Sequence, residues 1–242
     1  MTAGDRSDAT IYAMLGQLSP SAAALVLLDV PIEGMEALDG ARSRPVDRAL
    51  ASAGIAVLPS ALAGQRGPRL RDALLTAERS RLARIDVREM YPYAIYRVLA
   101  HLDARETLGS LGEGESHALL DADFTRFRPP RYKRRERDHD LRWRGIRYLH
   151  DLLTHPALEM RWEGLPAPEH ARGLAEDHLV DLYEAALGGV LGMLLLRGSG
   201  YVAVAGDIAR GEMVLLADVW LRERLTRRVP IAPVRATRPP AG

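Results

Sequence analysis

The sequence predicts an α/β protein, in which strands alternate with helices that cover a sheet. Residues 25–28 read LVLL and run directly into Asp29 and the turn-former Pro31, a pattern typical of a strand buried on both faces. Residues 84–92 read RIDVREMYP, where apolar and charged residues alternate as in a strand with one exposed face. Helical apolar spacing between and after these segments indicates crossover helices.

Local signals predict the remaining elements. Pro45 suits a first helical turn and Gly54 a helix end, so a helix is expected within residues 40–55. A hairpin is expected over residues 200–220, and the Pro- and Arg-rich residues 226–242 are expected to form a disordered tail. A single domain would then occupy residues 1–225. Further helices are expected at residues 8–20, 69–82, 93–102 and 176–198, with a basic segment at residues 124–153.

Composition limits the classes of protein. The net charge of the 242 residues is +1, so any nucleic-acid site must be a local patch. The absence of cysteine excludes disulfides, thiolate zinc sites and cysteine nucleophiles. No signal peptide is visible, and the apolar residues 185–196 are too few to span a bilayer, so we expect a cytoplasmic protein without a membrane partner. Of the 33 lysine and arginine residues, only Lys133 is a lysine. Either chance preserved it, or this position requires the compact point charge of an ammonium group.

Carboxylates follow both predicted strands, Asp29 after the first and Glu89 at the end of the second. Ligands of open α/β sheets bind beyond the carboxyl ends of strands, so parallel neighbours would bring these two acids to one edge, where a cation could separate them. Asp181 and Asp177, near the start of the helix 176–198, are further candidates. Three carboxylates without His or Cys favour Mg²⁺ or Mn²⁺, which serve phosphoryl chemistry. Alternatively, Asp29 is a helix N-cap or an Asx-turn acceptor.

Residues 126 to 147 include ten basic residues, with aromatic residues in and around the segment. Positive charge with interleaved aromatics suits a phosphate backbone and unstacked bases. The alternative is a solvated helix face, in which acidic residues pair with the arginines at helical spacing. The aromatic residues are Phe124, Phe127, Tyr132, Trp143 and Tyr148, and the acidic residues are Glu136, Asp138 and Asp140.

Six short stretches occur in a fixed order between residues 22 and about 217. They are LLDVPI (27–32), Arg44-x-x-Asp47, Pro59, EMYP (89–92), Tyr132-Lys133 with arginines after it, and HLVDLYEAAL (178–187). In this order they resemble the domain of unknown function 429 family, predicted nucleases with a ribonuclease H-like fold. The resemblance implies a ribonuclease H-like mixed sheet flanked by helices, and hydrolysis of phosphodiester bonds.

The resemblance also implies roles for individual residues. Asp29, Glu89 and Asp181 would be the catalytic ligands of Mg²⁺ or Mn²⁺. It places Arg44, Asp47 and Lys133 as supporting positions near the site. From the residues themselves we expect substrate binding by Lys133, Arg44, Arg134, Arg135 and Tyr132, with Asp47, Asp177 and Tyr91 in support. Alternatively, Arg44 and Asp47 form an ordinary helix ion pair at spacing i, i+3, worth a few tenths of a kcal/mol.

The sequence departs from the family at two places. The family's N-terminal strands, the first with an aspartate followed by glycines, have no counterpart here, and Leu182 stands where the family has a small residue. A sheet without those strands has an unpaired edge, which invites homodimerisation. Two functions are therefore expected as alternatives: a metal-dependent nuclease, and a non-catalytic module that binds nucleic acid or protein on the same scaffold.

Overall fold

The computed structural model describes residues 23–38, 42–57, 60–62, 64–81, 84–112, 114–133, 138–171 and 175–233. These residues form a mixed α/β protein, as predicted. The α-helices are α2 (Pro45–Ser52), α3 (Arg66–Arg81), α4 (Pro92–Asp103), α5 (His139–Leu153), α6 (Glu176–Leu196) and α7 (Val219–Thr226). The strands are β1 (Ala23–Leu28), β2 (Arg84–Glu89), β3 (Val202–Asp207), β4 (Gly211–Leu216) and β5 (Ile231–Pro233). The 3₁₀ turns are Met35–Leu38, Ser60–Leu62, Leu108–Gly112, Ala122–Thr125, Pro156–Leu158 and Pro168–His170.

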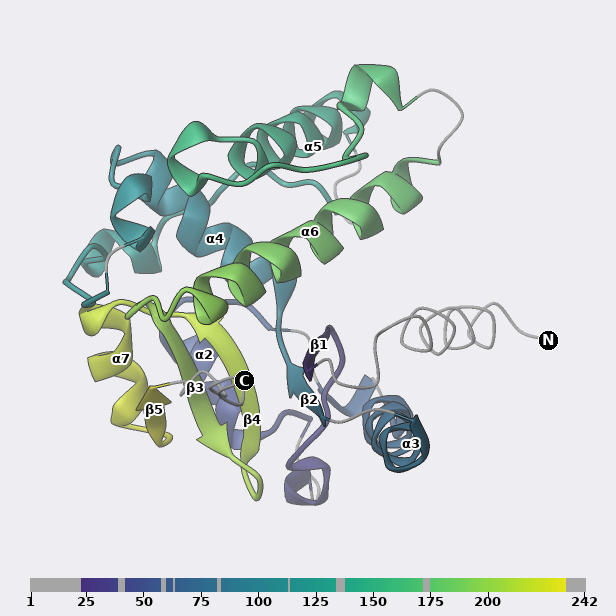
Figure 1. The fold of residues 1–242 in the computed structure, drawn as a ribbon. Helices are drawn as coiled ribbons and strands as arrows, with labels where there is room; N and C mark the ends of the chain where they lie inside the picture. Colours follow the sequence, from purple (N-terminus) through teal and green to yellow (C-terminus); the bar gives the residue numbers. More distant parts are fainter. Residues whose placement is uncertain are drawn as a thin grey trace.

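The strands form two small sheets that meet at one residue pair. β1 and β2 are parallel, and β4, β3 and β5 follow one another in an antiparallel sheet. A parallel bridge between Met90 and Val214 joins the end of β2 to β4, so the five strands run in the spatial order β1-β2-β4-β3-β5 (Figure 1). Among the described residues, no strand pairs with the outer edge of β1.

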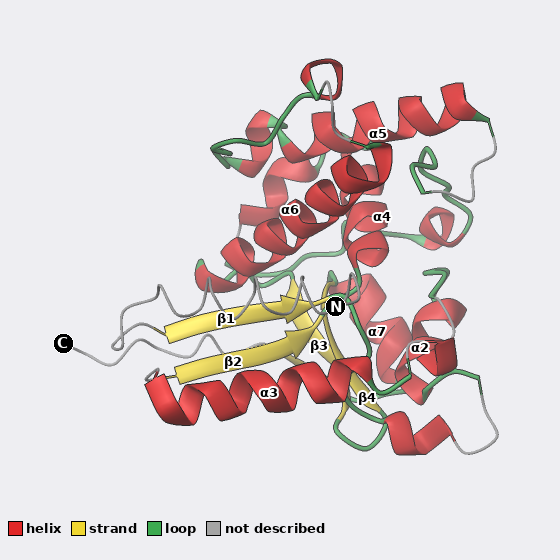
Figure 2. Ribbon diagram, turned by 90° about the vertical axis from the view of Figure 1, so that its right-hand side faces the viewer, coloured by secondary structure: helices red, strands yellow, loops and turns green. Residues whose placement is uncertain are grey.

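Helices pack on both faces of β1, but of its apolar run only Leu28 is buried, and Leu25, Val26 and Leu27 are half-buried. Val26 and Leu28 pack with Leu70 and Leu74 of α3, which runs along one face of the parallel pair (Figure 2). Leu25 and Leu27 turn toward α6, where a Cβ on Gly192 would lie 3.7 Å from Leu27 Cδ1. Helices therefore cover both faces of the parallel pair, although the sheet is smaller than expected.

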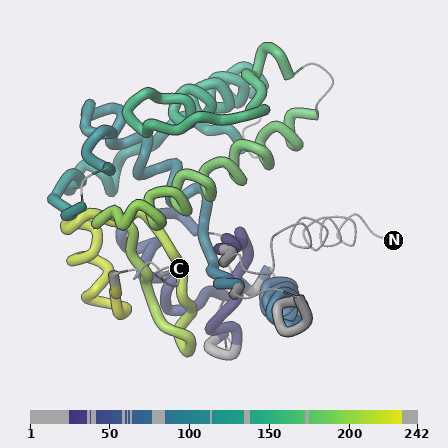
Figure 3. Tube along the Cα trace, viewed as in Figure 1, coloured from purple at the N-terminus to yellow at the C-terminus, as the bar shows by residue number. Residues whose placement is uncertain are grey.

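The long helix α6 lies between α5 on one side and the strands β1 and β3 on the other (Figure 3). It is 21 residues long, and by length and composition it could cross a membrane. The core helix of a soluble protein passes the same test, and most of its apolar side chains are buried against neighbouring elements. We therefore interpret α6 as a core helix.

Near the C-terminus the structure differs from the sequence prediction. The hairpin is present as β3 and β4, but the chain then forms α7, which begins at the N-cap Asp218. The expected disordered tail includes β5, which pairs with β3 through residues 231–233. The prediction was wrong for residues 231–233, because the surrounding prolines and arginines gave no strand signal; residues 234–242 lie outside the described residues. The helix expected at residues 8–20 lies outside the described residues.

Candidate functional site

A pocket of about 220 Å³ opens where the parallel strands end. This is the edge at which α/β sheets bind ligands. Charged side chains and an apolar wall share its lining, which consists of Asp29, Val30, Pro31, Arg44, Asp47, Val57, Ser60, Leu62, Glu89, Met90, Tyr91, Lys133 and Met213. Six of the residues singled out in the sequence therefore border one cavity.

The inner wall of the pocket is an ion-pair cluster around Arg44, the N-cap residue of α2. Its guanidinium donates to both carboxylate oxygens of Glu89, at 2.7 and 2.5 Å, and to Asp47 Oδ1 at 2.9 Å. Nε donates to Ser60 Oγ at 3.1 Å. All four side chains are at least 96% buried, so the expected weak helix pair of Arg44 and Asp47 is instead part of a buried network. We call these four residues the Arg44 cluster.

Glu89 is fully engaged within this cluster. Besides the two bonds from Arg44, its Oε2 accepts the backbone N–H of Ile32 at 2.8 Å. Burial raises the pKa of Glu89, while Arg44 and the Ile32 N–H act in the opposite direction. Burial alone would lower the pKa of Arg44, but its bonds to Glu89 and Asp47 raise it above the usual value. A metal ion at Glu89 would have to displace Arg44, so the structure gives Glu89 a structural role.

Asp29 and Glu89 end neighbouring strands but point to opposite faces. In the parallel pair Leu28 is in register with Glu89, so these two side chains share the face that α3 covers. Asp29 follows the last residue of β1, and the groups that act on its carboxyl include Glu184, Lys133 and Asp181 on the α6 side. The sequence correctly placed both acids at one edge, but the register separates their side chains.

On the α6 side a second group of charged residues faces Asp29, and its centre is Glu184. The Nζ of Lys133 lies 2.6 Å from Glu184 Oε1, and Tyr132 donates its hydroxyl to the same oxygen at 2.8 Å. Lys133 Nζ also lies 5.8 Å from the ring centroid of Tyr91. Tyr132 is 1% exposed, and burial followed by the Glu184 charge raises its pKa. The lone lysine therefore neutralises a carboxylate that the sequence analysis did not single out.

Asp29 carries the clearest electrostatic signature of the site. Its side chain remains exposed at the pocket mouth, but protein atoms crowd its carboxyl group. This loss of hydration, followed by the charge of Glu184, raises the pKa of Asp29 to about 7. Lys133 opposes the shift, and Glu89 and Asp181 add to it. Perturbed carboxyl groups in clefts are candidates for functional residues.

The other predicted site residues have distinct positions. Asp181 is exposed on α6, and partial burial followed by the charges of Glu184 and Asp177 raises its pKa. Asp177 accepts from Arg142 Nη2 at 2.7 Å, which ties α5 to the first turn of α6. Arg134 and Arg135 lie outside the described residues.

The described part of the basic segment divides into an inward and an outward set. Lys133 and Arg142 pair with acids of α6, whereas Arg144 and Arg147 are exposed on α5. A Cβ on Gly145 would collide with the carbonyl oxygen of Arg131, so the backbone of the exposed Arg131 passes close to this helix. We call Arg131, Arg144 and Arg147 the α5 surface; Arg126 and Arg128 are also exposed, further back in the preceding loop. Trp143 of α5 is half-buried, with its ring centroid 5.9 Å from the Arg147 guanidinium.

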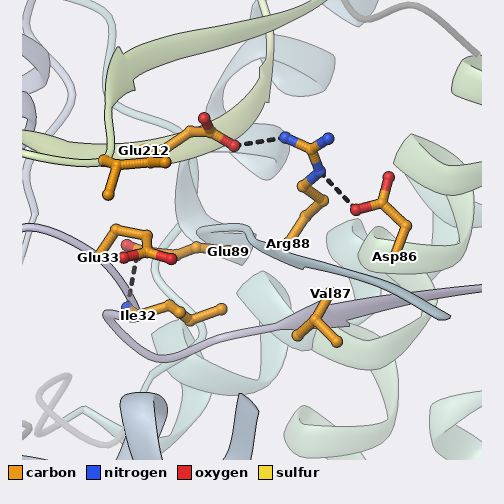
Figure 4. A pocket seen from close by; sticks show the side chains of 8 residues that line it. Ile32, Glu33, Asp86, Val87, Arg88, Glu89 and Glu212 are labelled. Carbon is orange, nitrogen blue, oxygen red and sulfur yellow. Dashed lines mark hydrogen bonds and ion pairs between the residues drawn. The ribbon is translucent and has the colours of Figure 1, made fainter. Parts of the chain in front are cut away.

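A second cavity, of about 190 Å³, lies where β2 faces the hairpin (Figure 4). There Arg88 donates to Asp86 at 2.7 Å and to Glu212 of β4 at 2.5 Å. Its charge is balanced by these partners, and the pairs link the two sheets. We therefore assign this cavity to the architecture of the protein.

The predicted ligands Asp29, Glu89 and Asp181 do not converge. Within the part of the chain that the structure describes, no three His, Asp or Glu side chains lie close enough together to hold a metal ion. Glu184 takes the position near Asp29 that Glu89 was expected to fill. Comparison with family models, with curated proteins and with solved structures found no match to this chain, so the functional argument depends on this geometry.

Proposed function

We propose that the protein is a divalent-metal-dependent hydrolase of phosphodiester bonds in nucleic acid, built on a ribonuclease H-like scaffold and located in the cytoplasm. The observation that carries the proposal is Asp29, held among carboxylates at the carboxyl edge of the parallel strands. Among the described groups that act on the Asp29 carboxyl, Glu184, Glu89 and Asp181 are acidic and Lys133 is basic. A pocket with uncompensated negative charge and hard oxygen donors suits Mg²⁺ or Mn²⁺.

Two carboxylates suffice for this type of ion. Mg²⁺ usually keeps several waters and binds through one or two protein carboxylates together with substrate phosphates. Asp29 and Glu184, whose charges act on each other, would be these two ligands, whereas Glu89 would not because Arg44 and Ile32 occupy its oxygens. When bound, the metal would supply an activated water and neutralise charge on the phosphate. The Arg44 cluster would keep the end of β2, and with it the pocket wall, in place.

Calorimetric titration with Mn²⁺ tests the metal site. We expect binding by the wild type, and a loss of at least tenfold in affinity for Asp29→Asn and Glu184→Gln, because each removes one of two direct ligands. Asp151→Asn is the matched control, since Asp151 is an exposed aspartate on α5, away from the pocket lining. Equal Mn²⁺ affinity in all four proteins would exclude this site.

Catalysis is tested separately with labelled single- and double-stranded DNA and RNA. Cleavage by the wild type in Mn²⁺ should stop in chelator and in Asp29→Asn, and should persist in Asp151→Asn. If Asp29→Asn cleaves as fast as the wild type, the activity does not belong to this pocket.

The second candidate function is a non-catalytic module that binds nucleic acid. The α5 surface favours it, because exposed arginines lie on and against the helix that carries Trp143, and Glu89 is committed to a structural pair. Fluorescence anisotropy with labelled single strands should show binding that weakens steeply with salt. Arg144→Gln and Arg147→Gln should weaken it, and Arg210→Gln, an exposed arginine in the β3–β4 turn, should not. Binding without turnover, unchanged by chelator, would favour the module over the hydrolase.

A further inference from the structure

Two cations neutralise carboxylates at the pocket, and they differ in how firmly they are held. The pairs of Arg44 join side chains that are 1% to 3% exposed. The pair between Lys133 and Glu184 joins side chains that are 37% and 14% exposed. A buried pair is costly to break because it leaves an uncompensated charge, whereas a solvated pair contributes little. Lys133 is therefore the cation that can leave.

The chemistry of lysine also makes the bond to Glu184 easy to exchange. An arginine could bind Glu184 through two parallel hydrogen bonds from its planar guanidinium, whereas an ammonium is a hydrated point charge on a flexible side chain. Every other basic residue of the chain is an arginine. The exception is Lys133, whose Nζ lies 2.6 Å from Glu184 Oε1 and 5.8 Å from the ring centroid of Tyr91.

We infer that Lys133 is an exchangeable counter-ion of the pocket, which neutralises Glu184 until a divalent cation binds Asp29 and Glu184 and releases the ammonium. This inference rests on the proposed function. The released ammonium remains tethered at the pocket mouth through Tyr132, whose ring and hydroxyl are buried against Glu184. An ammonium there presents three donors and one positive charge, which suits a phosphate oxygen of the substrate.

Two substitutions of Lys133 should act in opposite directions on Mn²⁺ affinity. Lys133→Met removes the competing charge, so Mn²⁺ should bind about tenfold more tightly. Lys133→Arg strengthens the internal pair, so Mn²⁺ should bind several-fold more weakly. Arg147→Met is the matched control for the loss of a basic side chain and should leave Mn²⁺ affinity unchanged. Calorimetry gives the affinities, and the rise of the melting temperature on adding Mn²⁺ gives an independent readout.

The outcomes separate this inference from the proposed function. If Asp29→Asn loses Mn²⁺ binding while wild type, Lys133→Met and Lys133→Arg bind equally, the metal site stands and the exchange is refuted. If none of the proteins binds Mn²⁺, both proposals are overturned. Circular dichroism of each variant establishes that it is folded.

Discussion

The Arg44 cluster provides the sharpest test of the physical reasoning. Arg44→Met keeps an unbranched apolar side chain of similar length but removes the guanidinium. Glu89 and Asp47, which are 4% and 2% exposed, would then be buried without their counter-ion. Breaking one partner of a buried ion pair costs about 3–5 kcal/mol, because the remaining charge loses its compensation. This would be a large share of a typical domain stability of about 5–15 kcal/mol.

Urea unfolding followed by tryptophan fluorescence and by circular dichroism measures this cost. Arg105→Met is the matched control, because Arg105 pairs with Asp121 at the surface, where the two side chains are 42% and 43% exposed. Such a pair is worth about 0–1 kcal/mol. We therefore expect the urea midpoint of Arg44→Met to fall far below that of Arg105→Met at unchanged m. Equal midpoints would show that the Arg44 cluster is open to water, and Glu89 would again be a candidate ligand.

Three further predictions concern pH and assembly. In the absence of metal, Asp29→Asn should melt at a higher temperature than the wild type. The difference in melting temperature should grow from pH 4 to pH 7, because the pKa of Asp29 is about 7 in the folded protein and lower in the unfolded chain. A difference that shrinks as the pH rises would contradict this. Burial lowers the pKa of His101, which contacts Phe124 and Phe127. The wild type should therefore lose stability below about pH 6.5, where the unfolded chain binds a proton at His101 and the folded protein does not, and His101→Phe should remove this loss. The outer edge of β1 should pair with a second copy, so sedimentation velocity should show a dimer; a monomer at all concentrations would refute this.

Local sequence signals predicted the elements of the fold well where one signal was strong. The apolar run of β1 and Pro45 at the start of α2 are examples, and both agree with the structure. β5 was missed because three residues carry no periodicity, and they become a strand only because β3 offers a free edge. The ribonuclease H-like topology stays a prediction, since small sheets of several topologies share these local patterns.

The Arg44 cluster shows why pair energies cannot be read from spacing. Arg44 and Asp47 are three residues apart in any helix, and on a solvated face that spacing is worth a few tenths of a kcal/mol. Here the end of β2 brings Glu89 to the same guanidinium, and Ser60 covers it. Burial, which depends on residues distant in sequence, decides between the two outcomes.

Glu184 is a residue of the candidate site that the sequence could have revealed. It shares one face of α6 with Gly188 and Gly192, because residues spaced by four and then four positions line one stripe of a helix. Gly192 lies against Leu27, and a Cβ on Gly188 would lie 3.0 Å from Met90, so this stripe runs along β1 and past the strand end. The next residue of the stripe toward the N-terminus is Glu184, which must then stand over the carboxyl edge near Asp29. The packing glycines therefore locate the acid, whereas strand ends alone could not, because a shift of one residue in register decides which face each acid joins.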